Sequence, residues 1–212
     1  MLQIKRFVFN PIEENTYIIY DESKEAVIID CGAFHPEEKR ALQQFISDNA
    51  LIPKHLLNTH LHLDHAFGNK FIYDTYHLSP EYHPFEERVP DMQQQANAFG
   101  MKVEVGNTGT PKHLNEGDKI TFGNTTLDVL MVSGHSPAGL CFYSKTDHVV
   151  FTGDVLFKQS VGRSDLWGGS HQLLISGIKN KLMSLPENTV VYPGHGPTTT
   201  IGNEKIYNPF LS

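Results

Sequence analysis

The stretch Thr59-His60-Leu61-His62-Leu63-Asp64-His65 decides how this sequence is interpreted, because it places four potential metal ligands within six residues. It follows a short apolar segment that predicts a strand. If the chain leaves that strand still extended, His60 and His62 point to the same side, because side chains alternate along extended backbone. Asp64 and His65 are adjacent and cannot share one face of a strand, so we expect the backbone to turn there into a helix. The pattern presents its ligands in two pairs, which suits two neighbouring metals better than one.

Histidine is the one unusual feature of the composition, with 12 residues among 212. With this composition, three histidines and an aspartate in that arrangement arise by chance about 0.002 times in a chain of this length. The structural alternative is a set of histidines on a solvated loop. The low chance frequency disfavours that alternative and favours a metal site.

Three more candidate ligands, His135, Asp154 and His195, lie in loops that follow apolar strands. Each comes directly after a glycine, as expected where the backbone must approach a site closely. Any one of them alone would be an ordinary loop residue. A dinuclear site needs more than four side chains, however, and these three supply the remainder. Imidazole and carboxylate ligands without thiolate suit zinc, manganese or iron rather than a structural cysteine-rich zinc site.

The remaining composition is that of a globular protein, at 39% hydrophobic and 19% charged residues. A net charge of −7, from 17 Lys and Arg against 24 Asp and Glu, argues against nucleic acid as a partner. Cys31 and Cys141 belong to no metal-binding spacing, so we expect two buried free thiols. The N-terminus does not resemble a signal peptide, and no apolar run approaches the roughly 20 residues of a membrane span. We therefore expect a cytoplasmic protein with no membrane partner, of undetermined oligomeric state.

Periodicity and turn residues predict two groups of strands, each joined to helices. The expected strands comprise residues 3–9, 15–20, 26–30 and 55–58 in the first group, and residues 118–122, 126–132, 140–144, 148–152 and 189–192 in the second. The expected helices comprise residues 36–49, 63–76, 91–99 and 171–183. Prolines interrupt the charged and amide-rich segment 77–112, which is otherwise hard to interpret. The pattern favours an α+β fold in which two sheets pack together with helices outside.

On these residues the sequence resembles the metallo-β-lactamase superfamily and, within it, the short glyoxalase II-like hydrolases. The resemblance covers nearly the whole chain and follows the family's order. The matching segments are Ile29-Asp30-Cys31-Gly32, the motif from His60 to His65, Gly134-His135-Ser136-Pro137-Ala138-Gly139, Phe151-Thr152-Gly153-Asp154 and Gly194-His195-Gly196. The resemblance implies an αββα four-layer sandwich, with two mixed sheets packed face to face, formed by residues 1–212 as a single domain.

The resemblance also implies a role for each candidate ligand. One divalent metal would be held by His60, His62 and His135, the other by Asp64, His65 and His195, and Asp154 would bridge the two. Zn²⁺ is the expected metal, with iron or manganese as alternatives. Asp64 and Asp154 are the expected catalytic residues, and Asp64 would also accept a hydrogen bond from the nucleophile. Asp30 would hydrogen-bond the metal loop, the alternative being a simple turn residue at the end of a strand.

The implied activity is hydrolysis of a small thioester, of the hydroxyacylglutathione hydrolase (glyoxalase II) type. Two metals about 3.5–4 Å apart can share a water and lower its pKa towards about 7, and the resulting bridging hydroxide would attack the carbonyl. Residues 155–169 resemble this subgroup in particular. Within them, Arg163 could bind the carboxylate of an anionic substrate or could pair with Asp165 to hold the loop. Trp167 is expected to be a packing anchor between glycine-rich turns, the alternative being a wall of the substrate site.

One departure from the family concerns the C-terminus. Full-length glyoxalase II enzymes carry a C-terminal helical domain that contributes to glutathione binding, whereas only 17 residues follow His195. We therefore expect no such domain here and a more open pocket. The residue types leave three alternatives: a mononuclear iron persulfide dioxygenase that uses His60, His135 and Asp154, a lactone, ester or β-lactam hydrolase of the same superfamily, and a non-catalytic metal-binding module.

Overall fold

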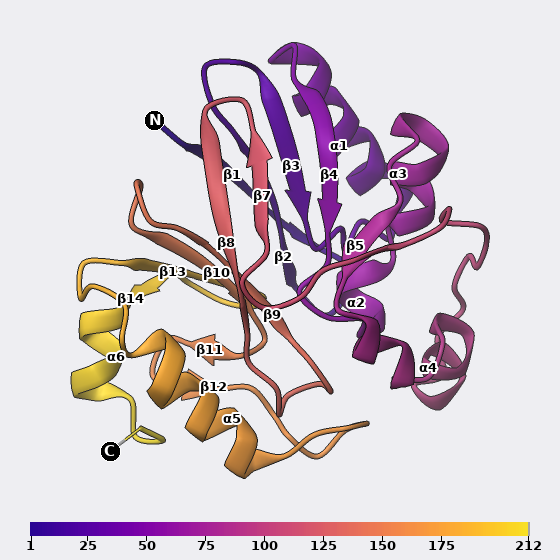
Figure 1. Ribbon diagram of the computed structural model, residues 1–212. Helices are drawn as coiled ribbons and strands as arrows, with labels where there is room; N and C mark the ends of the chain where they lie inside the picture. The colour runs from indigo at the N-terminus through magenta and orange to yellow at the C-terminus, as the bar shows by residue number, and fades with distance from the viewer. Residues whose placement is uncertain (212) are drawn as a thin grey trace.

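The computed structural model describes residues 1–211, which contain two six-stranded mixed sheets (Figure 1). The first sheet has the order β1 (Gln3–Phe9), β2 (Glu14–Tyr20), β3 (Glu25–Ile29), β4 (Ile52–Leu57), β5 (Pro80–Tyr82), β6 (Lys112–His113). The second has the order β14 (Thr199–Thr200), β13 (Val190–Pro193), β10 (Val149–Gly153), β9 (Leu140–Ser144), β8 (Thr125–Met131), β7 (Lys119–Phe122). A separate small hairpin pairs β11 (Leu156–Phe157) with β12 (Ser160–Val161).

Helices cover the outer faces of both sheets. The first sheet carries α1 (Pro36–Asp48) and α3 (Asn69–Tyr76), and the second carries α5 (His171–Gly177), its π-helical continuation η2 (Ile178–Leu182) and α6 (Ile201–Tyr207). Three short helices, α2 (Leu63–Ala66), the 3₁₀ helix η1 (Pro84–Arg88) and α4 (Met92–Ala98), lie beside one end of the first sheet. None of the helices within residues 1–211 has the length and apolarity required to cross a bilayer.

The alternation of side chains along the strands builds the layers. In β2, Tyr17 and Ile19 enter the apolar layer between the two sheets, whereas Ile18 and Tyr20 enter the layer beneath α1. Because both faces of the strand are covered, β2 is buried throughout. A third apolar layer lies between the second sheet and its helices. These layers confirm the predicted αββα sandwich, and both cysteines are buried and free as expected.

Two predicted elements need correction. The helix expected over residues 63–76 is divided into α2 and α3, because the backbone of Gly68 packs directly against Cys31. The Gly68 amide donates to the Cys31 carbonyl at 2.8 Å, and a Cβ on Gly68 would lie 2.3 Å from the Cys31 sulfur. The strand expected over residues 55–58 begins earlier, at Ile52. The elements that the sequence did not predict are the short strands β5, β6, β11, β12 and β14 and the helices η1 and α6.

Strand register positions the loops at one end of the sandwich. In the parallel pair β3 and β4, Ile29 lies opposite Leu57, so the chain leaves the sheet side by side at Asp30 and Asn58. The Asp30 amide donates to the Leu57 carbonyl at 2.9 Å and fixes this exit. The segments that follow β8, β10 and β13 carry the other predicted ligands to the same end.

Candidate metal centre

The structure brings all seven predicted ligands together. Within three groups of three, the potential ligand atoms lie no more than 4.8 Å from one another. One of these groups, Asp30 with His60 and His65, takes one histidine from each of the other two. The tri-imidazole group consists of His60, His62 and His135, and the mixed group consists of Asp64, His65 and His195. Asp154 lies between the groups. Its Oδ1 is 3.4 Å from His65 Nε2, and its Oδ2 is 3.6 Å from Nε2 of both His135 and His195.

Outer hydrogen bonds turn the Nε2 atoms of the ligand histidines inward. His135 Nδ1 donates to the carbonyl oxygen of Arg163 at 2.8 Å, and His195 Nδ1 donates to that of Glu13 at 3.2 Å. A carbonyl oxygen can only accept, so in each neutral ring the proton is on Nδ1 and the lone pair is on Nε2. This is the tautomer that binds a metal through Nε2.

Asp30 fixes one histidine from each group. Its carboxylate accepts from the Thr59 amide at 2.7 Å, the Thr59 hydroxyl at 2.6 Å and His65 Nδ1 at 3.1 Å. Because the Thr59 hydroxyl proton is engaged by Asp30, its oxygen accepts from His60 Nδ1 at 3.0 Å. Asp30 has φ = 51°, an uncommon conformation for a non-glycine residue. It therefore makes the loop contacts that the resemblance implies and does more than end a strand.

The buried atoms of the centre fit a pair of cations. His62 Nε2, His65 Nε2 and Asp154 Oδ1 are buried without a hydrogen-bond partner. In addition, Nε2 of His60 lies 3.2 Å from Nε2 of His135, and the outer contacts of both rings leave a lone pair on each of these atoms. An unpaired buried polar atom costs about 1–3 kcal/mol, and facing lone pairs repel. Divalent cations would satisfy all of these atoms, so the residues fit two metals.

Electrostatics differ between the two groups. Burial and the neighbouring imidazoles hold the pKa of His60 well below its ordinary value and lower that of His62 to about 3. Both rings are therefore neutral at pH 7. Burial also acts to lower the pKa of His65, but Asp154 and Asp64 outweigh it and raise that pKa. Burial acts to raise the pKa of Asp154, but the imidazoles, chiefly His65, lower it overall. The mixed group thus attracts positive charge.

Glycine permits the close approach of these segments, as the sequence predicted. A Cβ on Gly194 would lie 2.2 Å from Asp154 Oδ1 and 2.6 Å from His65 Cε1. Gly153 has φ = 49°, and a Cβ there would lie 2.3 Å from the Thr59 hydroxyl oxygen. Any side chain at these positions would push the ligand loops apart.

A cavity of about 180 Å³ opens onto the centre. Besides ligands from both groups, its walls include Ile12, Leu63, Gln95, Phe99, Arg163, Leu166 and Trp167. Trp167 is part of this wall, with its ring centroid 6.0 Å from that of Phe99 and 6.4 Å from that of His62, which favours the alternative that it borders the substrate site. Sequence reasoning missed Ile12 and Phe99, because single apolar residues in a turn and at a helix end carry no motif.

Arg163 lies in the cavity wall but already has a partner. Its Nε and one terminal nitrogen each donate to the carboxylate of Asp165 at 2.8 Å. The structure therefore contains the loop-holding pair that was the alternative to substrate binding.

Comparisons with known proteins point to one family. The model of the metallo-β-lactamase superfamily matches residues 10–195. YqgX of Bacillus subtilis, described as a probable metallo-hydrolase, is 34% identical over 210 residues, which are 98% of this chain and 97% of that protein. The hydroxyacylglutathione hydrolase GloC of Haemophilus influenzae is 34% identical over 204 residues, 94% of this chain and 93% of that protein.

Solved structures agree with this assignment. The B3 metallo-β-lactamase BLEG-1 has a TM-score of 0.89 at 37% identity and covers 99% of this chain and 100% of its own. The protein TTHA1623, solved in a di-iron-bound form, has a TM-score of 0.87 at 35% identity and covers 98% of this chain and 100% of its own.

Proposed function

The chain belongs to the metallo-β-lactamase superfamily, and we propose that it is a dinuclear metal-dependent hydrolase of small thioesters, of the hydroxyacylglutathione hydrolase type. The observation that carries the proposal is the convergence of seven imidazole and carboxylate side chains, with inward-facing lone pairs, at the base of an open cavity. The 34% identity to GloC over nearly the full length of both chains supports the thioester as substrate.

We assign the metals by the geometry of the two groups. The tri-imidazole group would hold one ion, the mixed group would hold the other, and Asp154 would contact both. When bound, two divalent ions acidify a shared water and polarise a substrate carbonyl. Zn²⁺ is our proposed metal because of the ligand types. Iron is the alternative, since TTHA1623 was solved with two irons.

The residues of this chain orient the reactants. Asp64 and Asp154 both border the cavity, so their carboxylates face a bound substrate. Asp64 Oδ2 lies 3.2 Å from His195 Nε2, where both atoms would bind the same metal, and the other carboxylate oxygen would accept a hydrogen bond from the nucleophile. The apolar walls Phe99, Leu166 and Trp167 would exclude water from the acyl group.

Arg163 is our proposed anchor for an anionic substrate. A substrate carboxylate would accept the two parallel hydrogen bonds that Asp165 now accepts, because the guanidinium fork suits either carboxylate. The pair is exposed, so this exchange costs little.

The deciding experiment is hydrolysis of S-D-lactoylglutathione by zinc-reconstituted protein, followed as loss of thioester absorbance, with chelator-treated protein as the blank. We expect metal-dependent turnover with kcat/KM above about 10⁴ M⁻¹s⁻¹. Absence of turnover by the fully metallated protein would overturn the glutathione thioester as substrate.

A second candidate substrate is a β-lactam, because BLEG-1, 37% identical over almost the whole chain, is a B3 metallo-β-lactamase. The same metallated protein should be assayed with a chromogenic cephalosporin. A kcat/KM for the cephalosporin above that for the thioester would favour this candidate. Oxygen uptake with glutathione persulfide would instead indicate the dioxygenase alternative.

A further inference from the structure

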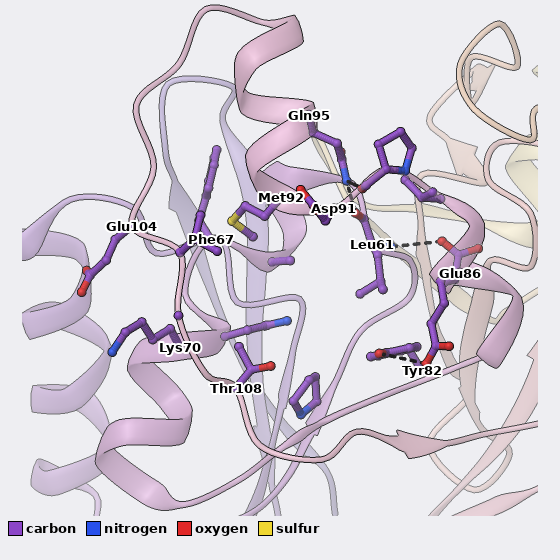
Figure 2. Close-up of a pocket in the computed structure, with 18 residues that line it drawn as sticks. Leu61, Phe67, Lys70, Tyr82, Glu86, Asp91, Met92, Gln95, Glu104 and Thr108 are labelled. Atoms are coloured by element: carbon purple, nitrogen blue, oxygen red, sulfur yellow. Dashed lines mark hydrogen bonds between the residues drawn. The ribbon is translucent and has the colours of Figure 1, made fainter.

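The side chains of Glu86 and Gln95 hold the backbone of the ligand loop, residues 59–65, by hydrogen bonds to its peptide groups. The Leu61 amide donates to Glu86 Oε2 at 3.1 Å, and the Leu61 carbonyl accepts from Gln95 Nε2 at 2.8 Å. The Leu63 amide donates to Gln95 Oε1 at 3.0 Å. Figure 2 shows Glu86 and Gln95 pointing towards Leu61. Both side chains come from η1 and α4, in the segment that the sequence left largely uninterpreted.

Glu86 also holds a second ligand segment. Its Oε1 accepts from the Ser136 hydroxyl at 2.8 Å and from the Ala138 amide at 2.7 Å. Ser136 directly follows His135 in the sequence. One fully buried carboxylate therefore joins the two segments that carry the tri-imidazole group. The Glu86 carboxylate accepts hydrogen bonds from three donors and uses both of its oxygens to do so.

Packing alone does not support this side of the loop. A cavity of about 380 Å³ lies there, and Leu61, Glu86 and Gln95 form part of its wall (Figure 2). Side chains that border an open cavity have fewer protein neighbours to pack against on that side. The hydrogen bonds to Glu86 and Gln95 must therefore supply much of the constraint on the loop.

The mixed group is held by other contacts. The Asp64 carbonyl accepts from Asn10 Nδ2 at 3.0 Å, and the His65 carbonyl accepts from Asn58 Nδ2 at 2.9 Å. His195 is held through the carbonyl of Glu13. None of these contacts involves Glu86, so the loss of its carboxylate should affect one group and spare the other.

We infer that Glu86 is a positioning residue for the tri-imidazole group, which it holds in register by accepting hydrogen bonds from Leu61 on one ligand segment and from Ser136 and Ala138 on the other. The inference rests on the proposed metal centre but not on the proposed substrate.

The test is Glu86→Gln, with Glu87→Gln as its matched control. A glutamine amide has one acceptor atom, so either Leu61 or the pair Ser136 and Ala138 must face an NH₂ group instead of an oxygen. Glu87 is the next residue, but its side chain is 50% exposed. Within residues 1–211 this side chain hydrogen-bonds only Tyr82 and His113.

The first readout is amide hydrogen exchange in the metal-free protein. We expect exchange at Leu61 or Ala138 to become at least about tenfold faster in Glu86→Gln and to stay unchanged in Glu87→Gln. Unchanged protection of both amides in Glu86→Gln would overturn the inference.

The second readout is Zn²⁺ titration, followed through the amide signals of residues 135–138 for the tri-imidazole group and residues 194–196 for the mixed group. Zn²⁺ affinity of the tri-imidazole group should fall about 10–100-fold, as for other outer partners of metal ligands, while the affinity of the mixed group is retained. Equal weakening of both groups, or of neither, would contradict a selective positioning role.

If Glu86→Gln does not fold, Ser136→Ala decides the question. It removes one donor and keeps the carboxylate, so it should weaken Zn²⁺ binding in the same group by a smaller factor, and no weakening would overturn the inference. Because neither readout uses a substrate, a protein without thioesterase activity can still confirm or refute the role of Glu86.

Discussion

The two halves of the candidate metal centre are built differently. The tri-imidazole group offers neutral, buried rings, and its backbone is held by Glu86 and Gln95. The mixed group includes a carboxylate and reaches the surface at His195, whose side chain is 24% exposed. One half thus depends on rigid geometry, and the other on negative charge close to solvent. One centre therefore combines a preorganised half with an accessible half, where water and substrate can exchange.

The largest effect should come from Asp154→Ala, because Asp154 is the ligand candidate that contacts both halves. Loss of an outer hydrogen-bond partner lowers metal affinity by up to roughly 100-fold, and we expect loss of Asp154 to lower the metal affinity of both halves by more than that. Metal content and hydrolysis should therefore be lost together. Metal analysis after gel filtration and the thioester assay measure this. An active variant that retains two metals would exclude the bridging role.

His195→Ala should separate the halves. His195 belongs only to the mixed group, and its ring hydrogen-bonds Asp64 and the Glu13 carbonyl, neither of which is a member of the tri-imidazole group. We expect about one equivalent of metal to remain. Loss of an outer hydrogen-bond partner alone lowers metal affinity by up to roughly 100-fold, and this variant removes a ligand of the mixed group itself. Metal analysis measures the remaining equivalent. Loss of both equivalents would show that the two halves bind metal as one unit and not separately.

Asp30→Asn should have a smaller effect that spans both halves. Its carboxylate accepts three hydrogen bonds and orients His65 directly and His60 through Thr59. An asparagine keeps one acceptor oxygen, so at least one of these contacts is lost. Chelator competition should show affinity about 10–100-fold weaker at both halves. An effect confined to one half would show that Asp30 positions only one of the two histidines, His65 or His60.

The seven ligand candidates could be identified from the sequence because chemistry marks them. They are histidines and aspartates clustered in one motif or placed after glycine at the end of a strand. The strand groups could be predicted because β2 and its neighbours carry long apolar patterns, and those patterns gave the correct layers.

Glu86 could not be identified in this way. Its role depends on donors from two distant loops, and its neighbour Glu87 has the same side chain but is half exposed. Nothing in the sequence separates the two residues. The division of the helix expected over 63–76 depends likewise on a contact with Cys31, which is distant in sequence from Gly68. Local patterns predict elements, whereas such contacts require the assembled fold.

The smallest effect should follow from Asp165→Asn, at the open side of the centre. Hydrogen bonding from Arg163 holds the pKa of Asp165 at about 2, so both partners are charged at pH 7. Both side chains are more than half exposed, and such pairs contribute little to stability, so the melting temperature should not change.

Freed from its partner, Arg163 should lower the KM for an anionic thioester about two- to fivefold without changing kcat. Arg163→Gln should raise that KM, and a neutral thioester should respond to neither change. If the anionic and neutral thioesters respond equally to Asp165→Asn, Arg163 only holds the loop.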